Sequence, residues 1–143
     1  MIQRIQTVYL SLVVVLTAVL FFVPVYGIAA GDAAAATYHT LAHFPKLMLA
    51  MAPVLVIAIA GIFSFKNRKR QLRLCRTGIV FSALIVSNNL LFAKWYAAYL
   101  LGSNELVFGY GTWLLPLNII FFFLAARGVR KDEELVRSAD RLR

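Results

Sequence analysis

Four long apolar stretches alternate with short polar or charged segments along this chain. They cover residues 5–26, 47–65, 77–93 and 111–126. Each is close to the roughly 20 residues that an α-helix needs to cross about 30 Å of hydrocarbon. The apolar residues run continuously instead of alternating with polar ones, which favours helices over the strands of a membrane β-barrel. The pattern therefore predicts an all-α fold, an integral membrane four-helix bundle within residues 1–126.

The composition agrees with a membrane protein. Apolar residues make up 62% of the chain and charged residues 15%, against about 45–50% and about 25% in soluble domains. The length of 143 residues fits a single domain. Cys75 is the one cysteine, so an intrachain disulfide and a CxxC site are excluded.

The basic residues gather on one side of the predicted bundle. Arg4 precedes the first stretch, six basic residues separate the second from the third, and six more follow the fourth, whereas only Lys46 and Lys94 lie on the other side. Because an excess of Lys and Arg marks cytoplasmic segments, we predict a multi-pass protein of the bacterial inner membrane with both termini in the cytoplasm. The basic residues between the second and third stretches, which we expect to contact anionic membrane lipid, are Lys66, Arg68, Lys69, Arg70, Arg73 and Arg76.

This charge distribution accounts for the net charge of +9, so no nucleic-acid partner is expected. The connections on the opposite side, residues 27–45 and 101–111, contain small and turn-forming residues and are expected to be loops. Most of the tyrosines and tryptophans lie in or next to them, as in the aromatic belt at a membrane surface. These residues are Tyr26, Tyr38, Trp95, Tyr96, Tyr99, Tyr110 and Trp113.

The first apolar stretch has an alternative interpretation. A basic start, an apolar run and the small residues of "YGIAAGDAAAA" share the outline of a secretory signal peptide, whose cleavage would leave three spans. Since its apolar run is longer than the roughly 7–15 residues typical of such a peptide, a retained helix is favoured.

Asparagines are the main polar residues inside the predicted spans. Asn88 and Asn89 lie in the third span and Asn118 lies in the fourth. Buried amides in membranes form hydrogen bonds between helices, so these residues are expected to fix helix packing. Two alternatives stay open: the amides line a cavity for a small ligand, or they contact another membrane subunit.

Signatures of catalysis are missing from the sequence. It matches neither GxxxxGK[ST] nor GxGxxG, the common nucleotide-binding patterns. His39 and His43 have the i, i+4 spacing of two metal ligands, but two ligands are too few for a structural metal site. We therefore expect no catalytic residues, no cofactor and no metal, and the chain is not expected to be an enzyme.

Residues 127–143 form a tail in which ten side chains are charged. It is predicted to be a short amphipathic helix, with acidic residues in its first turn and an apolar stripe that includes Leu135 and Val136. Mixed charges suit docking on a protein better than plain lipid binding. Two alternatives are docking on the chain's own basic loop and a tail that only anchors the topology. The docking residues are predicted to be Arg130, Lys131, Asp132, Glu133, Glu134, Arg137, Asp140 and Arg141.

The opening "MIQRIQTVYL" and the ending "RGVRKDEELVRSADRLR" resemble an uncharacterised family, a domain of unknown function, of short four-span inner-membrane proteins from Bacteroidota. This resemblance implies four transmembrane helices and no established activity. One arrangement that we consider places Gln3, Arg4 and Gln6 beside the acidic residues Asp132 to Glu134.

The interpretation that combines these observations is a non-enzymatic accessory or scaffold subunit. It would dock a membrane or cytoplasmic protein partner through its basic loop and its tail. The alternative is a protein that binds a small molecule, a quinone or a lipid in a cavity lined by the three asparagines. Association with further copies of the same chain is open in either case.

Overall fold

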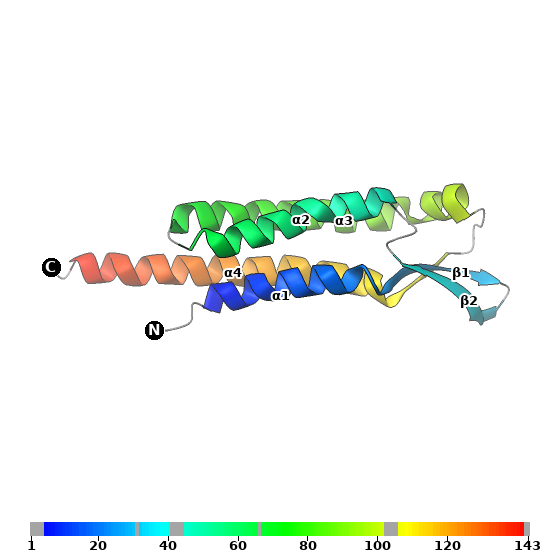
Figure 1. Ribbon diagram of the computed structural model, residues 1–143, viewed down its shortest axis with the longest axis horizontal. Helices are drawn as coiled ribbons and strands as arrows, with labels where there is room; N and C mark the ends of the chain where they lie inside the picture. The colour runs from blue at the N-terminus through cyan, green and yellow to red at the C-terminus, as the bar shows by residue number, and fades with distance from the viewer. Residues whose placement is uncertain (1–4, 31, 41–44, 66, 102–105, 142–143) are drawn as a thin grey trace.

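The computed structural model of the chain describes residues 5–30, 32–40, 45–65, 67–101 and 106–141. Within these ranges it contains four helices and one small sheet (Figure 1). The helices are α1 (Ile5–Leu20), α2 (Pro45–Phe63), α3 (Arg68–Leu101) and α4 (Tyr110–Arg141), and the strands are β1 (Pro24–Ala30), β2 (Asp32–Thr40) and β3 (Leu106–Phe108).

The helices lie side by side along one long axis, and successive helices run in opposite directions (Figure 1). Each helix packs against two others, in the cyclic order α1, α2, α3, α4. We call the end that holds the α2–α3 connection the basic end and the end that carries the strands the sheet end. The start of α1 and the end of α4 also lie at the basic end. The predicted four-helix bundle is confirmed.

Buried positions on every helix are spaced alternately by four and three residues. This repeat keeps one stripe of each helix facing its neighbours and is typical of bundles in which helices cross at about 20°. The stripes are Gln6, Leu10, Val13, Thr17 and Leu20 in α1, Leu47, Met51, Val54 and Ala58 in α2, Gln71, Cys75, Gly78, Ser82, Ile85 and Asn89 in α3, and Leu115, Asn118, Phe122, Ala125 and Val129 in α4.

One close approach of α3 to α4 depends on a glycine. A Cβ atom at Gly78 would lie 2.6 Å from the ring of Phe122, so no side chain fits there unless the ring moves. Small residues at helix contacts are the usual way in which membrane helices approach one another closely. The contact also determines which residues of α3 and α4 lie at the same height along the bundle axis.

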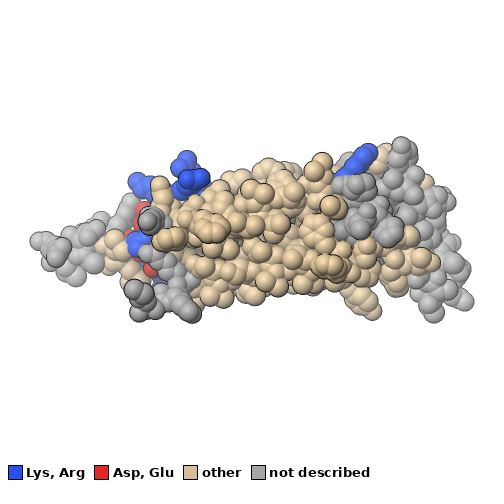
Figure 2. Space-filling model, viewed as in Figure 1, with Lys and Arg blue, Asp and Glu red and all other residues tan. Residues whose placement is uncertain are grey.

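Three helices are long and apolar enough to cross a membrane, over Lys46–Phe63, Arg68–Leu91 and Tyr110–Val136. α1 is apolar but shorter, with 16 residues. Large apolar side chains are exposed along the bundle. On the face shown in Figure 2, the described residues of the middle section include no lysine, arginine, aspartate or glutamate. The protein is therefore a helical membrane protein.

Two helices extend beyond the bounds that the apolar stretches suggest. α3 begins at Arg68 and has 34 residues, so most of the predicted basic loop is its first two turns. α4 has 32 residues and includes the charged tail, which is the end of this helix and not a separate one. Arg, Lys and Glu are good helix formers, and no glycine–proline pair interrupts either segment, so each helix continues past the apolar stretch.

The structure differs from the expected loops at residues 27–45 and 101–111. Parts of both segments form an antiparallel sheet in the order β2-β1-β3. Tyr26 in β1 is the pairing partner of His39 on one side and of Phe108 on the other. The first apolar stretch is accordingly divided between α1 and β1. Pro24 lacks an N–H and disfavours a helical conformation of the preceding residue, which explains why α1 ends before it.

Hydrogen bonds join the sheet to the start of α4 and to α3. The carbonyl oxygen of Val25 accepts the backbone N–H of Gly109 at 2.8 Å and the hydroxyl of Thr112 at 2.7 Å. The hydroxyl of Tyr26, which is 1% exposed, donates to the carbonyl oxygen of Asn89 at 3.4 Å. The sheet end is thus fixed to the helices by contacts between segments far apart in the sequence.

Candidate functional site

The most distinctive feature of the basic end is the part of α4 that projects past the other helices (Figure 1). Val129 is the last buried residue of the α4 stripe. The same face of the helix continues beyond it with Asp132, Leu135 and Val136. Leu135 is 60% exposed and Val136 is 42% exposed. This helical face therefore changes from buried to exposed because the neighbouring described helices end.

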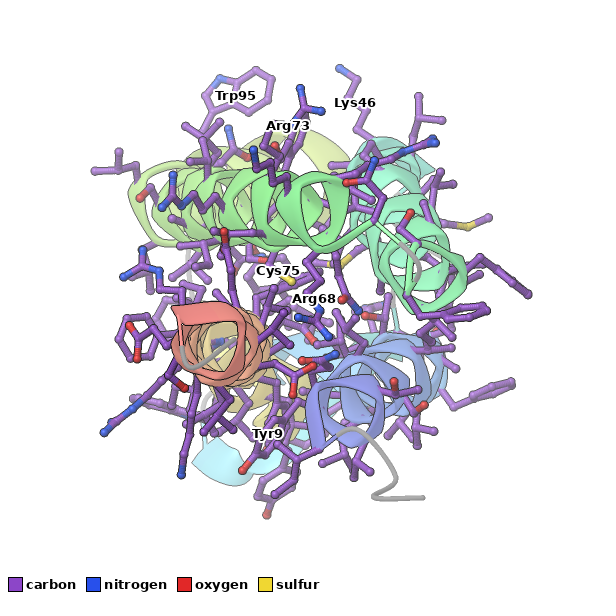
Figure 3. The ribbon with its side chains drawn as sticks, turned by 90° about the vertical axis from the view of Figure 1, so that its left-hand side faces the viewer. Tyr9, Lys46, Arg68, Arg73, Cys75 and Trp95 are labelled. Atoms are coloured by element: carbon purple, nitrogen blue, oxygen red, sulfur yellow. The ribbon has the colours of Figure 1, made fainter. Side chains whose placement is uncertain are left out.

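Asp132 of the predicted docking set contacts Arg68 of the predicted basic loop. Arg68 Nη2 lies 3.8 Å from Asp132 Oδ2, and Arg68 Nη1 donates to the backbone oxygen of Asp132 at 3.3 Å. Seen from the basic end, Arg68 is directed toward the space between α1 and α4 (Figure 3). Since both partners are partly exposed, such a pair contributes only about 0–1 kcal/mol. The tail is placed by the continuity of α4 more than by this pair.

The other predicted docking residues are distributed around the end of α4. Arg130, Lys131 and Glu134 are exposed, and Glu133 is half-buried. Arg137, Asp140 and Arg141 lie in the last turns of the helix, and their side chains lie outside the part that the structure describes.

The predicted lipid-contacting residues lie at the start of α3. Lys69, Arg70, Arg73 and Arg76 are exposed, and Arg73 points away from the bundle (Figure 3). Arg68 differs from them because it turns inward. Lys66 lies outside the described residues. The basic end shown in Figure 2 carries a group of Lys and Arg side chains at the edge of the uncharged section.

A cavity of about 270 Å³ lies between α1, α3 and α4 at the basic end. Gln6, Arg68, Lys131 and Asp132 line it. Gln6 is 2% exposed, and its amide nitrogen has no hydrogen-bond partner among the described residues. Gln6 and Asp132 are thus brought to one place, as the sequence-based arrangement suggested, while Gln3 and Arg4 lie outside the described residues.

Gln71 is a buried polar residue at the same end that the sequence did not single out. It is fully buried, and its amide nitrogen donates to the backbone oxygen of Gly61 at 3.1 Å. Gln71 was not identified from the sequence because it lies among basic residues, in a segment that was expected to be an exposed loop. The four-and-three spacing from Cys75 and Gly78 would have identified it as part of the buried stripe.

Among the cavities formed by the described residues, the three asparagines are not found together. Asn88 is exposed and lines a groove of about 470 Å³ between α2 and α3. Asn89 is 1% exposed and lines a different cavity, of about 120 Å³, beside Thr112 of α4. Asn118 is 2% exposed and lines neither. Consecutive residues on a helix point about 100° apart, which explains why Asn88 and Asn89 have different neighbours.

Asn118 instead belongs to a buried polar layer near the middle of the bundle. Ser82 is four residues after Gly78, and Asn118 is four residues before Phe122, so the Gly78–Phe122 contact puts both at one level. Gly128 of α4 lies next to Gln6 of α1. Since Thr17 follows Gln6 by about as many residues as Asn118 precedes Gly128, Thr17 lies at nearly the same height along the bundle. Each of the three has a buried polar atom without a hydrogen-bond partner among the described residues. The sequence did not single out Thr17 or Ser82.

The two histidines considered as metal ligands are His39 and His43. His39 lies on β2 opposite Tyr26, and His43 lies outside the described residues. Among the residues that the structure describes, no group of three or more His, Cys, Asp or Glu side chains could hold a metal ion.

Comparison with known proteins assigns the chain to a family. Residues 2–142 match the family model described as a domain of unknown function (DUF4293), and the chain belongs to this family. The predicted resemblance to an uncharacterised family is therefore confirmed. Neither a curated protein nor a solved structure matches the chain.

Proposed function

We propose that this member of the family is a non-enzymatic accessory or scaffold subunit of the bacterial inner membrane. Its four helices cross the bilayer, with both termini in the cytoplasm, and the projecting end of α4 docks a protein partner. The observation that carries this proposal is the exposed continuation of the core-facing stripe of α4 at Leu135 and Val136.

The chemistry of this surface indicates the kind of partner. Exposed apolar side chains gain about 25 cal/mol for each Å² that is removed from water. Leu135 and Val136 follow the spacing of the α4 stripe, which elsewhere packs against helices. A partner that continues the same packing is an amphipathic helix, with polar groups for the charged side chains at the rim, such as Arg130 and Glu134.

The charges and aromatic residues support the orientation. Lys69, Arg70, Arg73 and Arg76 are exposed at the basic end, where the anionic inner leaflet would attract them. Tyr110 and Trp113 are exposed near the start of α4 at the sheet end, where aromatic residues suit the outer membrane boundary. A single-cysteine labelling experiment tests this orientation. In Cys75→Ala chains, Tyr38→Cys should react with an impermeant reagent in intact cells, and Ser138→Cys only after permeabilisation.

The docking surface is tested by placing the same charge on two faces of α4. Val136→Glu changes the proposed contact, whereas Ser138→Glu adds the same charge two residues further on, about 200° around the helix. Full-length protein and both variants are purified from native membranes in mild detergent. Any captured protein is then produced separately, and its affinity for each form is measured.

We expect Val136→Glu to weaken binding by roughly tenfold or more, as for charged replacements at the centre of an interface, while Ser138→Glu stays within about twofold of the parent chain. A chain that ends at Glu134 should also lose the partner, and it retains the Arg68–Asp132 contact. The proposal fails if all four forms bind alike. It also fails if the captured protein is only a second copy of this chain.

The groove between α2 and α3 supports a second candidate function, the binding of a quinone or another apolar molecule. Its lining is mostly apolar, with Ser87 and Asn88 as polar groups, which is the usual character of small-molecule sites. Asn88→Leu should reduce the amount of ligand that co-purifies with the protein, while Asn118→Leu should not. Equal ligand content in both variants would remove this candidate.

A further inference from the structure

The cavity at the basic end holds more hydrogen-bond donors than acceptors. Arg68 carries five N–H donors and uses its two terminal nitrogens toward Asp132, at 3.3 Å and 3.8 Å. Lys131 is exposed and adds three donors,. The amide nitrogen of Gln6 is buried and has no hydrogen-bond partner among the described residues. A ligand that satisfies these groups must be rich in acceptors.

The charges of the lining residues indicate an anionic group with a donor attached to it. Arg68 and Lys131 carry positive charges, and Asp132 carries one negative charge, which leaves the lining with a net positive charge. Asp132 Oδ2 accepts no hydrogen bond from the described residues, although Arg68 lies nearby. A phosphodiester satisfies the basic side chains and the amide of Gln6, and a primary ammonium satisfies the carboxylate.

The position of the cavity favours a lipid over a free phosphate compound, and its size fits a headgroup. At about 270 Å³ it is smaller than the roughly 300–1,000 Å³ of pockets for whole drug-sized ligands, as expected if only a headgroup enters. Ile5, which is 60% exposed, forms part of the rim, and Val8 continues the exposed apolar surface of α1 one turn further on. Acyl chains would lie along this surface while the headgroup occupies the cavity.

We propose that the cavity between α1, α3 and α4 binds the headgroup of a phospholipid that carries a phosphodiester and a primary ammonium, as in phosphatidylethanolamine. Arg68, Lys131 and Gln6 donate to the phosphate oxygens, and Asp132 accepts from the ammonium. This site adjoins the docking surface and shares Leu135 with it, whereas Val136 belongs to the docking surface alone and does not line the cavity. The lipid would lie against α4 where the helix leaves the membrane, next to the projecting end.

The test is native mass spectrometry of the full chain in detergent with added dimyristoyl phosphatidylethanolamine. Phosphatidylcholine with the same acyl chains is the comparison, since its trimethylammonium group has no N–H to donate. Gln6→Leu and Arg68→Gln alter the cavity. Arg73→Gln is the matched control, because it removes the same charge from the same helix at a side chain that points away from the bundle and is expected to attract anionic lipid, whereas phosphatidylethanolamine carries no net charge. Thermal unfolding of each variant verifies that it is folded.

We expect one phosphatidylethanolamine to bind more tightly than phosphatidylcholine. Affinity should fall roughly tenfold in Gln6→Leu and Arg68→Gln, as for the loss of a charge-assisted hydrogen bond, and change less than about twofold in Arg73→Gln. Val136→Glu should leave lipid binding unchanged, so failure of the docking surface and failure of this site are distinguishable.

Three results would overturn the proposal. The first is equal binding of the two lipids by the parent chain. The second is an equal loss of affinity in Arg68→Gln and Arg73→Gln, which would indicate general attraction to charge. The third is displacement of the lipid by equimolar inorganic phosphate or glycerophosphoethanolamine, which would identify a soluble phosphate compound as the ligand.

Discussion

At the sheet end, the carbonyl oxygen of Val25 accepts two hydrogen bonds shorter than 3 Å from Gly109 and Thr112. At the basic end, the amide nitrogen of Gln6 and Oδ2 of Asp132 have no hydrogen-bond partner among the described residues. The core-facing stripe of α4 is also exposed there, at Leu135 and Val136. Buried polar groups without partners are costly, so those that line the cavity at the basic end favour a ligand that satisfies them. The comparison indicates that the joint at Val25 holds the fold together, and it supports the proposals that the basic end binds a lipid and a protein partner.

The largest expected effect is at the sheet end. A Cβ atom at Gly109 would collide with the backbone oxygen of Pro24, which cannot move without shifting β1. Gly109→Ala should therefore lower the free energy of unfolding by about 2–3 kcal/mol. Thermal and denaturant unfolding in detergent would measure this change.

The matched control lies at the basic end. A Cβ atom at Gly128 would lie 3.4 Å from Cβ of Gln6, an ordinary contact, so Gly128→Ala should be neutral or slightly stabilising because alanine favours helices. Equal destabilisation by both substitutions would contradict the comparison.

The second prediction removes one hydrogen bond from the joint between β1 and α4. Thr112→Val keeps the shape of the side chain but loses the 2.7 Å bond to Val25, which should cost about 1 kcal/mol. Thr77→Val removes an exposed bond from Thr77 to Arg73 within α3 and should change the stability by less than about 0.5 kcal/mol. Chemical unfolding of the two variants side by side would show whether the joint at Val25 is as important as its geometry indicates.

The third prediction concerns the buried amide at the basic end. Gln6→Leu replaces a side chain that is 2% exposed, whose nitrogen lacks a partner, by an apolar one of similar size. In detergent without phospholipid, the stability should stay the same or rise by up to about 1 kcal/mol. Added phosphatidylethanolamine should stabilise the parent chain more than the variant. A marked loss of stability without lipid would show that Gln6 is a structural residue.

The smallest effect is expected from the ion pair. Asp132→Asn removes the charge that faces Arg68 across 3.8 Å and should change the free energy of unfolding by less than about 1 kcal/mol, because both side chains are partly exposed. A double-mutant cycle with Arg68→Gln measures the coupling energy. A coupling well above this range would mean that the pair, and not the continuity of α4, places the charged tail.

Much of the helical architecture follows from local sequence. The apolar stretches located all four helices, and the charges identified the end at which α1 begins and α4 finishes. The bounds were less accurate, since Arg68–Arg76 and residues 127–141 continue α3 and α4 instead of forming a loop and a separate helix. Apolarity marks where a helix meets lipid, and it does not mark where hydrogen bonding along the helix stops.

The candidate sites were less predictable. Three asparagines are recognisable from the sequence as polar residues in apolar stretches: Asn88, Asn89 and Asn118. Whether they lie together depends on the rotation of each helix and on which helices are neighbours. Thr17 and Ser82 were overlooked because serine and threonine are unremarkable in a membrane helix. The stripe spacing would have grouped Ser82 with Asn89, and Gln71 with Cys75, on one face of α3.

The sequence by itself determined the membrane class, the helices and the side of the bundle on which the basic residues gather, because these depend on composition and on short-range periodicity. Only the tertiary structure decided that β1 pairs with β3, that Gln6 lies with Arg68 and Asp132, and that the α4 stripe continues beyond its neighbours. Each of these depends on contacts between segments at least 60 residues apart in the chain. Such contacts are set by how whole helices pack against one another, and no local pattern of residues encodes them.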